Sequence, residues 1–420
     1  SPPPLQFCRG VKDSKRRGFI NVALRSVETT LHQLLADVPS WGAEFRNLAQ
    51  ALGAILATDV YAQIDVPPAD NSAMDGYALR IDDLVGDRPL PISQRIPAGA
   101  TGGALQAGTA ARIFTGASIP PGADTVIAQE DCELIGELLQ VNVTPRTGQH
   151  IRPRGQDITR GQLILAKGHR LVAADLGLLA SLGIASVQVA RRIRVALMST
   201  GDELREPGQA LADGQIYNSN RPMLAALIES LGAEVIDIGI VADTPEATRD
   251  ALKRAAASAE VVISSGGVSV GEEDHVKAEV EALGSLNLWK LAIKPGKPLA
   301  YGRVLEVPFF GLPGNPVSGF VTFCLLVRPY LLKMQGATKL LPPQWPARAQ
   351  FEWPRAGTRQ EYLRARVVPG DEGMEVEIHP QQSSGALSSV SWCNALAIIP
   401  IGKTLRRGDR VDVIFLQDIS

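Results

Sequence analysis

Apolar strands alternate with amphipathic helices between residues 192 and 340, and this alternation restricts the fold more than any other feature of the chain. The apolar strands are expected at Ile193–Met198, Glu234–Ile240, Val261–Ser264, Leu286–Ala292 and Pro308–Leu312, and the helices at about 218–231, 244–258, 274–283 and 315–333. A repeated strand–helix unit predicts a doubly wound α/β domain with a mostly parallel sheet. In such a domain the loops that follow the strands bind the ligand.

The remaining segments predict a helical start and two β-rich regions. Apolar residues recur at helical spacing over residues 20–38, and Pro39 ends that helix. A second helix is predicted over residues 45–58. Short β-like runs then alternate with Gly/Pro turns and indicate small β modules between about 60 and 190. These runs are Ala111–Phe114, Thr125–Ala128, Leu138–Val143 and Gln162–Leu165, and the chain becomes β-like again from 341 to 420.

Charge and cysteine content exclude several classes of protein. The chain has 420 residues, 42 Lys and Arg against 44 Asp and Glu, and a formal net charge of −2. That balance gives no general attraction to nucleic acid or anionic lipid, so an anion site must be local. The 4 cysteines form no C-x-x-C pair, which favours a reducing, cytoplasmic location. The longest apolar run, Phe320–Leu332, contains Arg328 and is shorter than the ~18 residues of a membrane helix.

Three loops that follow strands in the α/β region have the composition of anion sites. They are Ser199–Glu203, Ser264–Gly271 and Gly311–Ser318. Their glycines let backbone amides approach an anion, and a following helix adds a favourable dipole. A plain turn is the alternative for the second loop, and helix capping by Pro316 is the alternative for the third.

Lysines and carboxylates occupy neighbouring loops. Lys290, Lys294 and Lys297 surround a segment that Pro295, Gly296 and Pro298 stiffen, which predicts an oxyanion site over the alternative of a solvated basic turn. Acidic residues occupy similar loop positions, and they are Asp202, Glu203, Asp243, Glu272, Glu273 and Asp274. Carboxylates beside a phosphate site predict Mg²⁺, although each could instead be a helix cap.

Polar residues also gather in the β-rich region. They lie in Pro67–Ala78, Arg112–Ala117 and Ile151–Asp157, and Asx-rich turns are the alternative interpretation. Spacing alone does not place these segments beside the α/β loops. The residues by themselves therefore support a phosphate- or oxyanion-binding α/β enzyme with attached β modules.

Taken together, these segments resemble the molybdopterin molybdenumtransferases, the MoeA family that includes the E domain of gephyrin. The resemblance spans about residues 20–335 in family order, with a weaker match to the end. The segments that carry it are DNSAMDGYAL (70–79), RIFTGASIPPGADTVIAQED (112–131), IRPRGQDI (151–158), STGDEL (199–204), GQIYNSNRPML (214–224), SSGGVSVGEEDHVK (264–277), WKLAIKPGKPLAYG (289–302) and GLPGNPVSGFVTF (311–323).

The resemblance implies an organisation into domains and a homodimer. It implies a basic tail over 1–19, a helix over 20–39 packed on the α/β domain, and a linking domain split between 40–61 and 161–191. A β-rich lobe would occupy 62–160, the α/β molybdopterin-binding domain 192–340, and a C-terminal β-barrel 341–420. The active site would be shared between subunits.

The implied reaction is Mg²⁺-dependent insertion of molybdate into adenylylated molybdopterin with release of AMP. The resemblance places catalytic roles on Asp75, Thr115, Asp157, Glu203, Asp243, Asp274, Lys290 and Lys294, of which Glu203, Asp243 and Asp274 would hold the metal. It places substrate binding on Ser265, Gly266, Gly267, Ser269, Gly271, Lys297, Pro298, Gly314, Asn315, Pro316, Ser318, Arg364 and Ser384.

The C-terminal region departs from the family pattern, and other functions remain open. The family commonly has Gly-Ser-Gly where this chain has Ser383-Ser384-Gly385, so the loop loses one glycine's freedom. The alternatives are a molybdopterin adenylyltransferase, a non-catalytic scaffold and a tungstate-using relative. Partners would be molybdopterin adenylyltransferase and molybdoenzyme chaperones, with no nucleic acid and no membrane. The basic tail is expected to be solvated, with a transit peptide as the alternative.

Overall fold

The structure of the protein is a computed structural model that describes residues 24–267, 275–371 and 373–420. The chain divides into two compact units. One unit contains the described residues up to Val38, Ile193–Tyr330 and Leu341–Ser420, and the other contains Pro39–Arg192 with Leu331–Leu340. The predicted tail over 1–19 lies outside the described residues. Each unit is described by itself.

A six-stranded sheet with the order β16-β13-β17-β21-β20-β18 forms the centre of the α/β domain. The first four strands are parallel, and β20 runs antiparallel to both neighbours. The mostly parallel, doubly wound arrangement is therefore confirmed, but the sequence prediction missed β20. The strands are β13 (Arg194–Thr200), β16 (Glu234–Val241), β17 (Val261–Ser265), β18 (Gly284–Lys290), β20 (Pro298–Val304) and β21 (Val307–Leu312), and the short pair β14 (Leu204–Arg205) and β15 (Ile216–Tyr217) lies apart.

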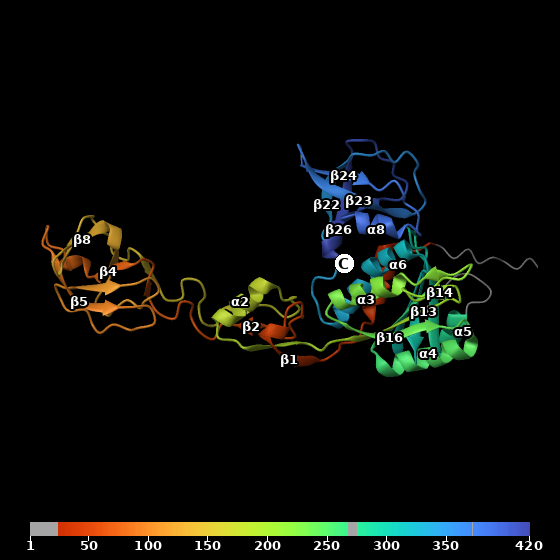
Figure 1. Ribbon diagram of the computed structural model, residues 1–420, viewed down its shortest axis with the longest axis horizontal. Coiled ribbons are helices and arrows are strands. Elements are labelled where there is room, and N and C mark those ends of the chain that lie inside the picture. The colour runs from red at the N-terminus through yellow and green to blue at the C-terminus, as the bar shows by residue number, and fades with distance from the viewer. Residues whose placement is uncertain (1–23, 268–274, 372) are drawn as a thin grey trace, which may run out of the picture. The chain divides into compact units, whose positions relative to one another are not determined.

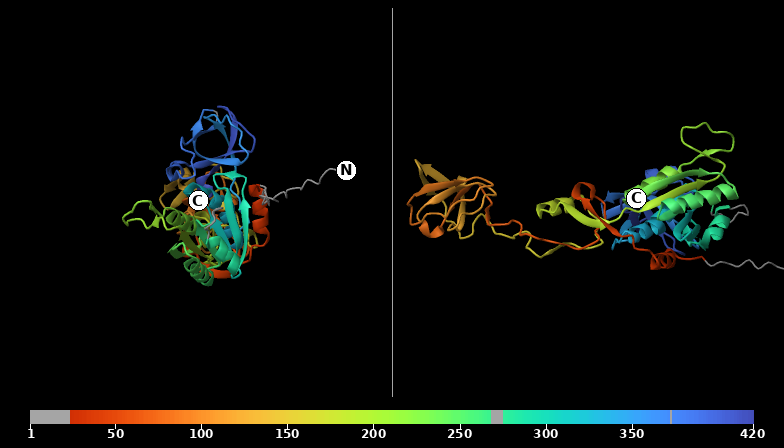
Figure 2. Two further views of the ribbon diagram at one scale, coloured as in Figure 1. Left: turned by 90° about the vertical axis from the view of Figure 1, so that its right-hand side faces the viewer. Right: turned by 90° about the horizontal axis from the view of Figure 1, so that it is seen from below.

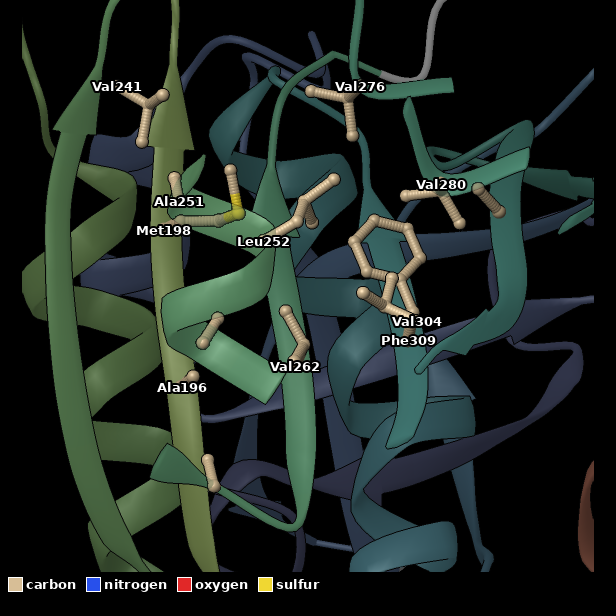
Figure 3. Packing of buried hydrophobic residues seen from close by; sticks show 13 residues of the cluster. Ala196, Met198, Val241, Ala251, Leu252, Val262, Val276, Val280, Val304 and Phe309 are labelled. Carbon is tan, nitrogen blue, oxygen red and sulfur yellow. The ribbon is translucent and has the colours of Figure 1, made fainter. Parts of the chain in front are cut away.

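Helices cover both faces of this sheet (Figure 1). On one face lie α4 (Pro245–Ser258) and α5 (His275–Leu283), and on the other lie α3 (Asn220–Ser230) and α6 (Pro316–Thr322). Figure 3 shows Leu252 of α4 and Val280 of α5 pointing onto Val262 and Phe309 of the sheet. These side chains are at most 1 % exposed, so apolar burial of about 25 cal/mol per Å² fixes the helices to the sheet.

The apolar helix at the end of this domain has the length of a membrane span. After α6 the chain continues through the π-helical segment η4 (Phe323–Val327) into α7 (Arg328–Met334). In the described part of the chain, Pro316–Met334 is the one helix long and apolar enough to cross a membrane, and 94 % of it is buried inside the protein. That degree of burial is typical of a core helix.

The N-terminal helix begins later than its apolar spacing predicts. It is α1 (Val27–Ala36), and the Oγ of Ser26 caps it by accepting a hydrogen bond from the amide of Thr29 at 3.1 Å. Arg25 is held in extended pairing instead, because its amide donates to Lys290 and its carbonyl accepts from Ala292. The prediction of a helix from residue 20 is therefore wrong over the described residues 24–26. The helix contacts η4 of the α/β domain.

The C-terminal region is a closed five-stranded β-barrel, as predicted. Strand β25 pairs with both β26 and β23 and so closes the ring, which the left view of Figure 2 shows in blue. The barrel core contains Leu363, Val376 and Val413. Its elements are β22 (Trp345–Ala349), β23 (Gln360–Gly370), β24 (Gly373–Ile378), α8 (Leu387–Trp392), β25 (Ala395–Ile399), β26 (Arg410–Phe415) and η5 (Leu416–Asp418), and β19 (Ile293–Lys294) adds to β23.

The first part of the second unit contains a strand where a helix was predicted. Residues 45–58 begin in β1 (Ala43–Asn47), which pairs with β12 (Ser186–Ala190), and continue through η1 (Leu48–Gln50) without an α-helix. The pairing joins segments about 140 residues apart, so local helical spacing did not reveal it. Strands β2 (Val60–Tyr61) and β11 (Leu163–Leu165) also pair, and α2 (Ala173–Ser181) packs Leu179 beside Val187 and Val189.

The second part of this unit is the predicted β-rich lobe. Its sheet has the order β7-β4-β6-β5-β9-β8, and a separate short pair joins β3 to β10. Two apolar clusters fill the two faces, one around Ile127 and one around Ile113. The elements are β3 (Asn71–Ser72), β4 (Gly76–Leu79), η2 (Ile81–Asp83), β5 (Leu90–Ile96), β6 (Ala110–Ile113), β7 (Thr125–Ala128), η3 (Gln129–Asp131), β8 (Cys132–Ile135), β9 (Leu138–Val141) and β10 (Ile151–Arg152).

Candidate active site

A cavity of about 1240 Å³ lies where the parallel strands of the α/β domain end, between that domain and the loops of the barrel. This is the place at which ligands bind in doubly wound sheets. Most of the predicted site residues line it: Glu203, Asp243, Ser265, Gly266, Gly267, Lys294, Lys297, Pro298, Gly314, Asn315, Ser318 and Ser384. The fold therefore gathers residues separated by more than 180 positions.

Asn220 links two of the loops that the sequence singled out. Its Nδ2 donates to the Oγ of Ser265 at 2.9 Å and to the carbonyl of Gly314 at 2.7 Å. Asn220 is the first residue of α3, is 8 % exposed, and lines the cavity. One amide group thus holds the ends of β17 and β21 in a fixed relation.

Two glycines in the first of these loops are required by the backbone. Gly266 and Gly267 have φ angles of +92° and +68°, a region that side chains other than glycine rarely occupy. A Cβ on Gly267 would lie 2.4 Å from Cγ2 of Val276 and 2.9 Å from Oγ1 of Thr200. The loop beyond them contains the predicted residues Ser269, Gly271 and Asp274, which lie outside the described residues.

Two of the three predicted metal ligands face the cavity. The carboxylate of Glu203 lies over Gly201, where a Cβ would meet Oε2 of Glu203 at 2.5 Å. Asp243 is held by a hydrogen bond from its amide to Oδ1 of Asp202 at 3.2 Å. Among the described residues there is no group of three His, Cys, Asp or Glu side chains that could hold a metal ion. Mg²⁺ needs only one or two carboxylates when phosphate and water complete its shell, so the pair fits that ion.

The basic loop enters the cavity from the edge of the domain. The Lys294–Pro295 peptide is cis, and Gly296 has a φ of +106°, where an added Cβ would lie 2.6 Å from Oγ1 of Thr322. Lys294 and Lys297 line the cavity, and Nζ of Lys294 lies 3.0 Å from Oε2 of Glu361. Lys290 is not among the lining residues, and its carbonyl instead accepts a hydrogen bond from Arg25.

The barrel supplies the opposite wall of the cavity. The amide of Val317, in the first turn of α6, donates to the carbonyl of Ser384 at 3.0 Å. This bond docks the loop Gln382–Ser384 on the turn that begins at Pro316. Ser383 has no positive φ, so the serine that replaces the family's glycine is accommodated without backbone strain.

Arg364 lies behind this loop instead of lining the cavity. Its side chain is 1 % exposed, and it donates to the Ser383 carbonyl at 3.2 Å and to Oγ of Ser389 at 3.1 Å. Burial lowers the pKa of Arg364 to about 10, so the guanidinium remains charged at neutral pH. In this structure it supports the Ser383–Ser384 turn from beneath.

The predicted residues of the β-rich lobe also meet one another. Oδ1 of Asp75 accepts hydrogen bonds from the amide and the hydroxyl of Thr115, both at 2.8 Å. These bonds from Thr115, with the nearby Arg112 guanidinium, hold the pKa of the Asp75 carboxyl below its usual value. Asp75 and Thr115 are both exposed, so this carboxylate is available to a ligand.

Asp157 is exposed in a neighbouring loop of the same unit. Strand β10 before it pairs with β3, which joins the segment 151–158 to the segment 70–79. Arg154 fixes the loop, because its Nε pairs with Oδ2 of Asp65 at 2.5 Å and its amide donates to Asp70 at 2.7 Å. Three sequence segments of the lobe therefore converge on one surface.

Three family models match successive segments that together span most of the chain. Residues 25–183 match a family model described as the MoeA N-terminal region, domains I and II. Residues 196–333 match a probable molybdopterin binding domain, and residues 346–416 match the MoeA C-terminal region, domain IV. The chain belongs to the MoeA family. The resemblance inferred from the sequence motifs is thus confirmed.

Individual MoeA proteins agree over most of their length. The molybdopterin molybdenumtransferase of Haemophilus influenzae is 41 % identical over 363 residues, which cover 85 % of this chain and 89 % of that protein. The molybdopterin molybdenumtransferase of Nostoc is 39 % identical over 388 residues, covering 89 % and 88 %. A crystal structure of the molybdopterin biosynthesis MoeA protein of Pyrococcus horikoshii has a TM-score of 0.80 at 30 % identity and covers 94 % of this chain and 100 % of that chain.

The structure adds lining residues that sequence reasoning on this MoeA chain did not name one by one as site residues. Thr200, Gly201, Pro295, Gly296, Pro313 and Ser383 lie in loops that the sequence had singled out, and the further lining residues are Leu204, Ile216, Asn220, Arg359 and Gln382. Asn220 lies inside a segment that carried the family resemblance, so the sequence held a signal for it. Arg359 had none, because only the pairing of β23 with β19 brings the barrel to the basic loop.

Proposed function

We propose that this MoeA-family protein inserts molybdate into the dithiolene of adenylylated molybdopterin and releases AMP. The relatives that share most of the chain are named molybdopterin molybdenumtransferase, which supports a transferase of molybdenum cofactor biosynthesis. The observation that carries the proposal is the single cavity in which glycine-rich loops face a basic loop. Amides and lysines are the groups that bind phosphates and oxyanions.

The basic part of the cavity suits a tetrahedral dianion. Lys297 and Arg359 supply positive charge to its wall, Lys294 adds an ammonium group paired with Glu361, and Ser318 supplies a hydroxyl. Charge-assisted hydrogen bonds to oxyanions are about twice as strong as neutral ones. We assign molybdate to this part of the cavity.

The glycine-rich part suits the phosphates of the nucleotide and the pterin. The amides of Gly267, Gly314 and Asn315 lie on loops that Asn220 ties together, whereas the Gly266 amide donates to the Leu312 carbonyl at 3.1 Å. The volume of about 1240 Å³ is larger than a typical drug-sized site and admits a dinucleotide-like substrate. Bound Mg²⁺, held by Glu203 and Asp243, would neutralise charge on the pyrophosphate that is cleaved.

The lobe residues have their role in a homodimer under this proposal. Asp75, Thr115 and Asp157 would complete the active site from the lobe of a second subunit, as the family resemblance implies. The protein would act in the cytoplasm, with a molybdopterin adenylyltransferase supplying substrate and molybdoenzyme chaperones accepting product.

The test measures AMP release from adenylylated molybdopterin by purified protein with Mg²⁺, with and without molybdate. Molybdate-dependent release that falls at least about tenfold in Lys297→Ala supports the insertase, because a lost charged contact is worth about that factor. Lys253→Ala is the matched control, since Lys253 is exposed on α4 and does not line the cavity. Binding of substrate without AMP release under any oxyanion would contradict the proposal and favour a scaffold. Synthesis of adenylylated molybdopterin from ATP would favour the adenylyltransferase.

A further inference from the structure

A buried carboxylate of the barrel neutralises one of the two lysines of the basic loop. Oε2 of Glu361 lies 3.0 Å from Nζ of Lys294, and the side chains of Glu361 and Lys294 are 8 % and 48 % exposed. The Lys294 ammonium also lies 6.0 Å from the ring centroid of Trp353. Lys294 faces the cavity, whereas Glu361 is not among the lining residues. Glu361 therefore acts on a ligand without touching it, through its pairing with Lys294 and through its charge.

Backbone bonds on both sides hold this pair in register. Ile293 and Lys294 of β19 pair with Gln360 and Glu361 of β23. The amide of Gln360 donates to Ala292 at 2.8 Å, and Nη1 of Arg359 donates to the Ile293 carbonyl at 3.2 Å. The carboxylate is thus fixed beneath the lysine by two main chains and is not a flexible surface partner.

The other cations of the cavity wall have no such carboxylate. Among the ion pairs formed by described residues, none joins Lys297 or Arg359 to an acid. Within the described residues Lys297 and Arg359 thus have no acidic ion-pair partner, whereas the Lys294–Glu361 pair presents a dipole with no net charge. The sequence places Lys294 and Lys297 in the same basic loop, but in the tertiary structure only Lys294 pairs with a described acid.

We propose that Glu361 is a positioning residue that weakens the hold of the cavity on its oxyanion by occupying Lys294. This inference rests on the proposed function, because it assigns the oxyanion to the basic loop. A dianion beside Lys294 meets a fixed negative charge one ammonium group away, and that repulsion opposes binding. The same carboxylate limits the rotamers of Lys294, which favours binding and so opposes this repulsion. An anion that has to be transferred onward benefits from a site that releases it.

Glu361→Gln tests the inference by removing the charge and retaining the shape. The measurement is the dissociation constant of molybdate by isothermal titration calorimetry, in full-length protein without the pterin substrate. We expect Glu361→Gln to bind molybdate about tenfold more tightly, with a steeper dependence on salt, since one repulsive charge is removed. Glu361→Asp keeps the charge and should stay within about threefold of wild type.

Two further variants separate this role from general structural damage. Glu260→Gln is the matched control, because Glu260 is a buried carboxylate paired with Arg194 at 2.5 Å, at the end of β13 away from the cavity. It should leave molybdate affinity unchanged. Combining Glu361→Gln with Lys294→Met should abolish the gain, since the freed ammonium is then gone.

The outcomes distinguish this inference from the proposed function. Tighter binding in Glu361→Gln alone supports the role of Glu361, and unchanged or weaker binding in a folded Glu361→Gln protein overturns it. If Glu361→Gln fails to fold, the molybdate affinity of the wild-type protein and of Glu361→Asp is measured over a range of sodium chloride concentrations. A molybdate affinity that does not change with salt in either protein would overturn the inference, and the same salt dependence in both would support it. Failure of the wild-type protein to bind molybdate overturns the proposed function itself.

Discussion

The side-chain amide of Asn220 donates a hydrogen bond of 2.7 Å to the carbonyl of Gly314, across 94 positions of sequence. The same nitrogen bonds Ser265, so one residue on α3 sets the spacing of the two glycine-rich loops. The geometry of the cavity wall therefore depends on a side chain that joins a hydroxyl of one loop to a backbone carbonyl of the other.

Asn220→Ala is expected to destabilise the protein by about 1–3 kcal/mol, because it removes the partner of the buried Ser265 hydroxyl and of the Gly314 carbonyl. The loss should appear in chemical denaturation followed by circular dichroism. Asn287→Ala is the control, since Asn287 is exposed on β18 and its replacement should cost less than about 0.5 kcal/mol. Equal effects of the two substitutions would contradict the linking role.

Gly267→Ala is expected to cost more than Gly208→Ala. Both glycines have positive φ angles, of +68° and +93°, so alanine is strained at each by about 1–2 kcal/mol. Only at Gly267 would the new Cβ also clash, 2.4 Å from Val276, which adds about 1–3 kcal/mol. Thermal unfolding of the two variants measures the difference, and a larger loss at Gly208 would show that the loop around Gly267 rearranges freely.

Thr115→Val is expected to raise the pKa of Asp75 toward its usual value of about 3.9. The substitution removes the hydroxyl donor, while the Thr115 amide still donates to Asp75. Because the folded pKa is lowered, the two bonds stabilise the lobe above the unfolded pKa, and that contribution is lost as the pH falls through the folded pKa. Carbon-13 NMR titration of the carboxyl groups measures the shift. Asp65, whose pKa is lowered by Arg160 and Arg154, should not move.

Lys294→Ala is expected to destabilise the protein as well as to impair oxyanion binding. The substitution leaves the Glu361 carboxylate, 8 % exposed, without the ammonium at 3.0 Å. Unpaired buried charges cost several kcal/mol, and since Lys294 is half exposed, about 1–3 kcal/mol is expected here. Lys294→Ala with Glu361→Gln should recover most of that loss in a denaturation experiment. A double variant as unstable as the sum of the single variants would show that the pair is not coupled.

The α/β domain was predictable because its pattern is local. Strand β17 is a continuous apolar run, and α4 has Thr244 as its N-cap and Pro245 in its first turn, so each element is recorded in a few neighbouring residues. The prediction of a helix over residues 45–58 was wrong for the opposite reason. Its strand β1 exists because β12 lies beside it, and nothing within residues 45–58 encodes that partner.

The residues of the candidate site were likewise predictable only where neighbouring residues encode them. The glycine-rich and basic loops were recognised from composition and family motifs, and most of their residues line one cavity. Arg364 was expected at the oxyanion, but its side chain lies behind the Ser383–Ser384 turn, because β23 turns Leu363 and Ala365 into the barrel core and Arg364 to the opposite face, toward Ser389 of α8. Whether a side chain from a motif faces a cavity or a core depends on the strand register, which the motif does not contain.

The sequence by itself determined which residues carry the chemistry and which elements surround them, because turn chemistry, apolar period and family motifs are properties of contiguous residues. Only the tertiary structure decided how those residues are paired. It joined Asp75 to Thr115, Asn220 to Gly314 and Lys294 to Glu361, and it left Lys297 without an acidic partner among the described ion pairs. The physical reason is that hydrogen bonds and charge pairs act over about 3 Å in space, whatever the distance along the chain.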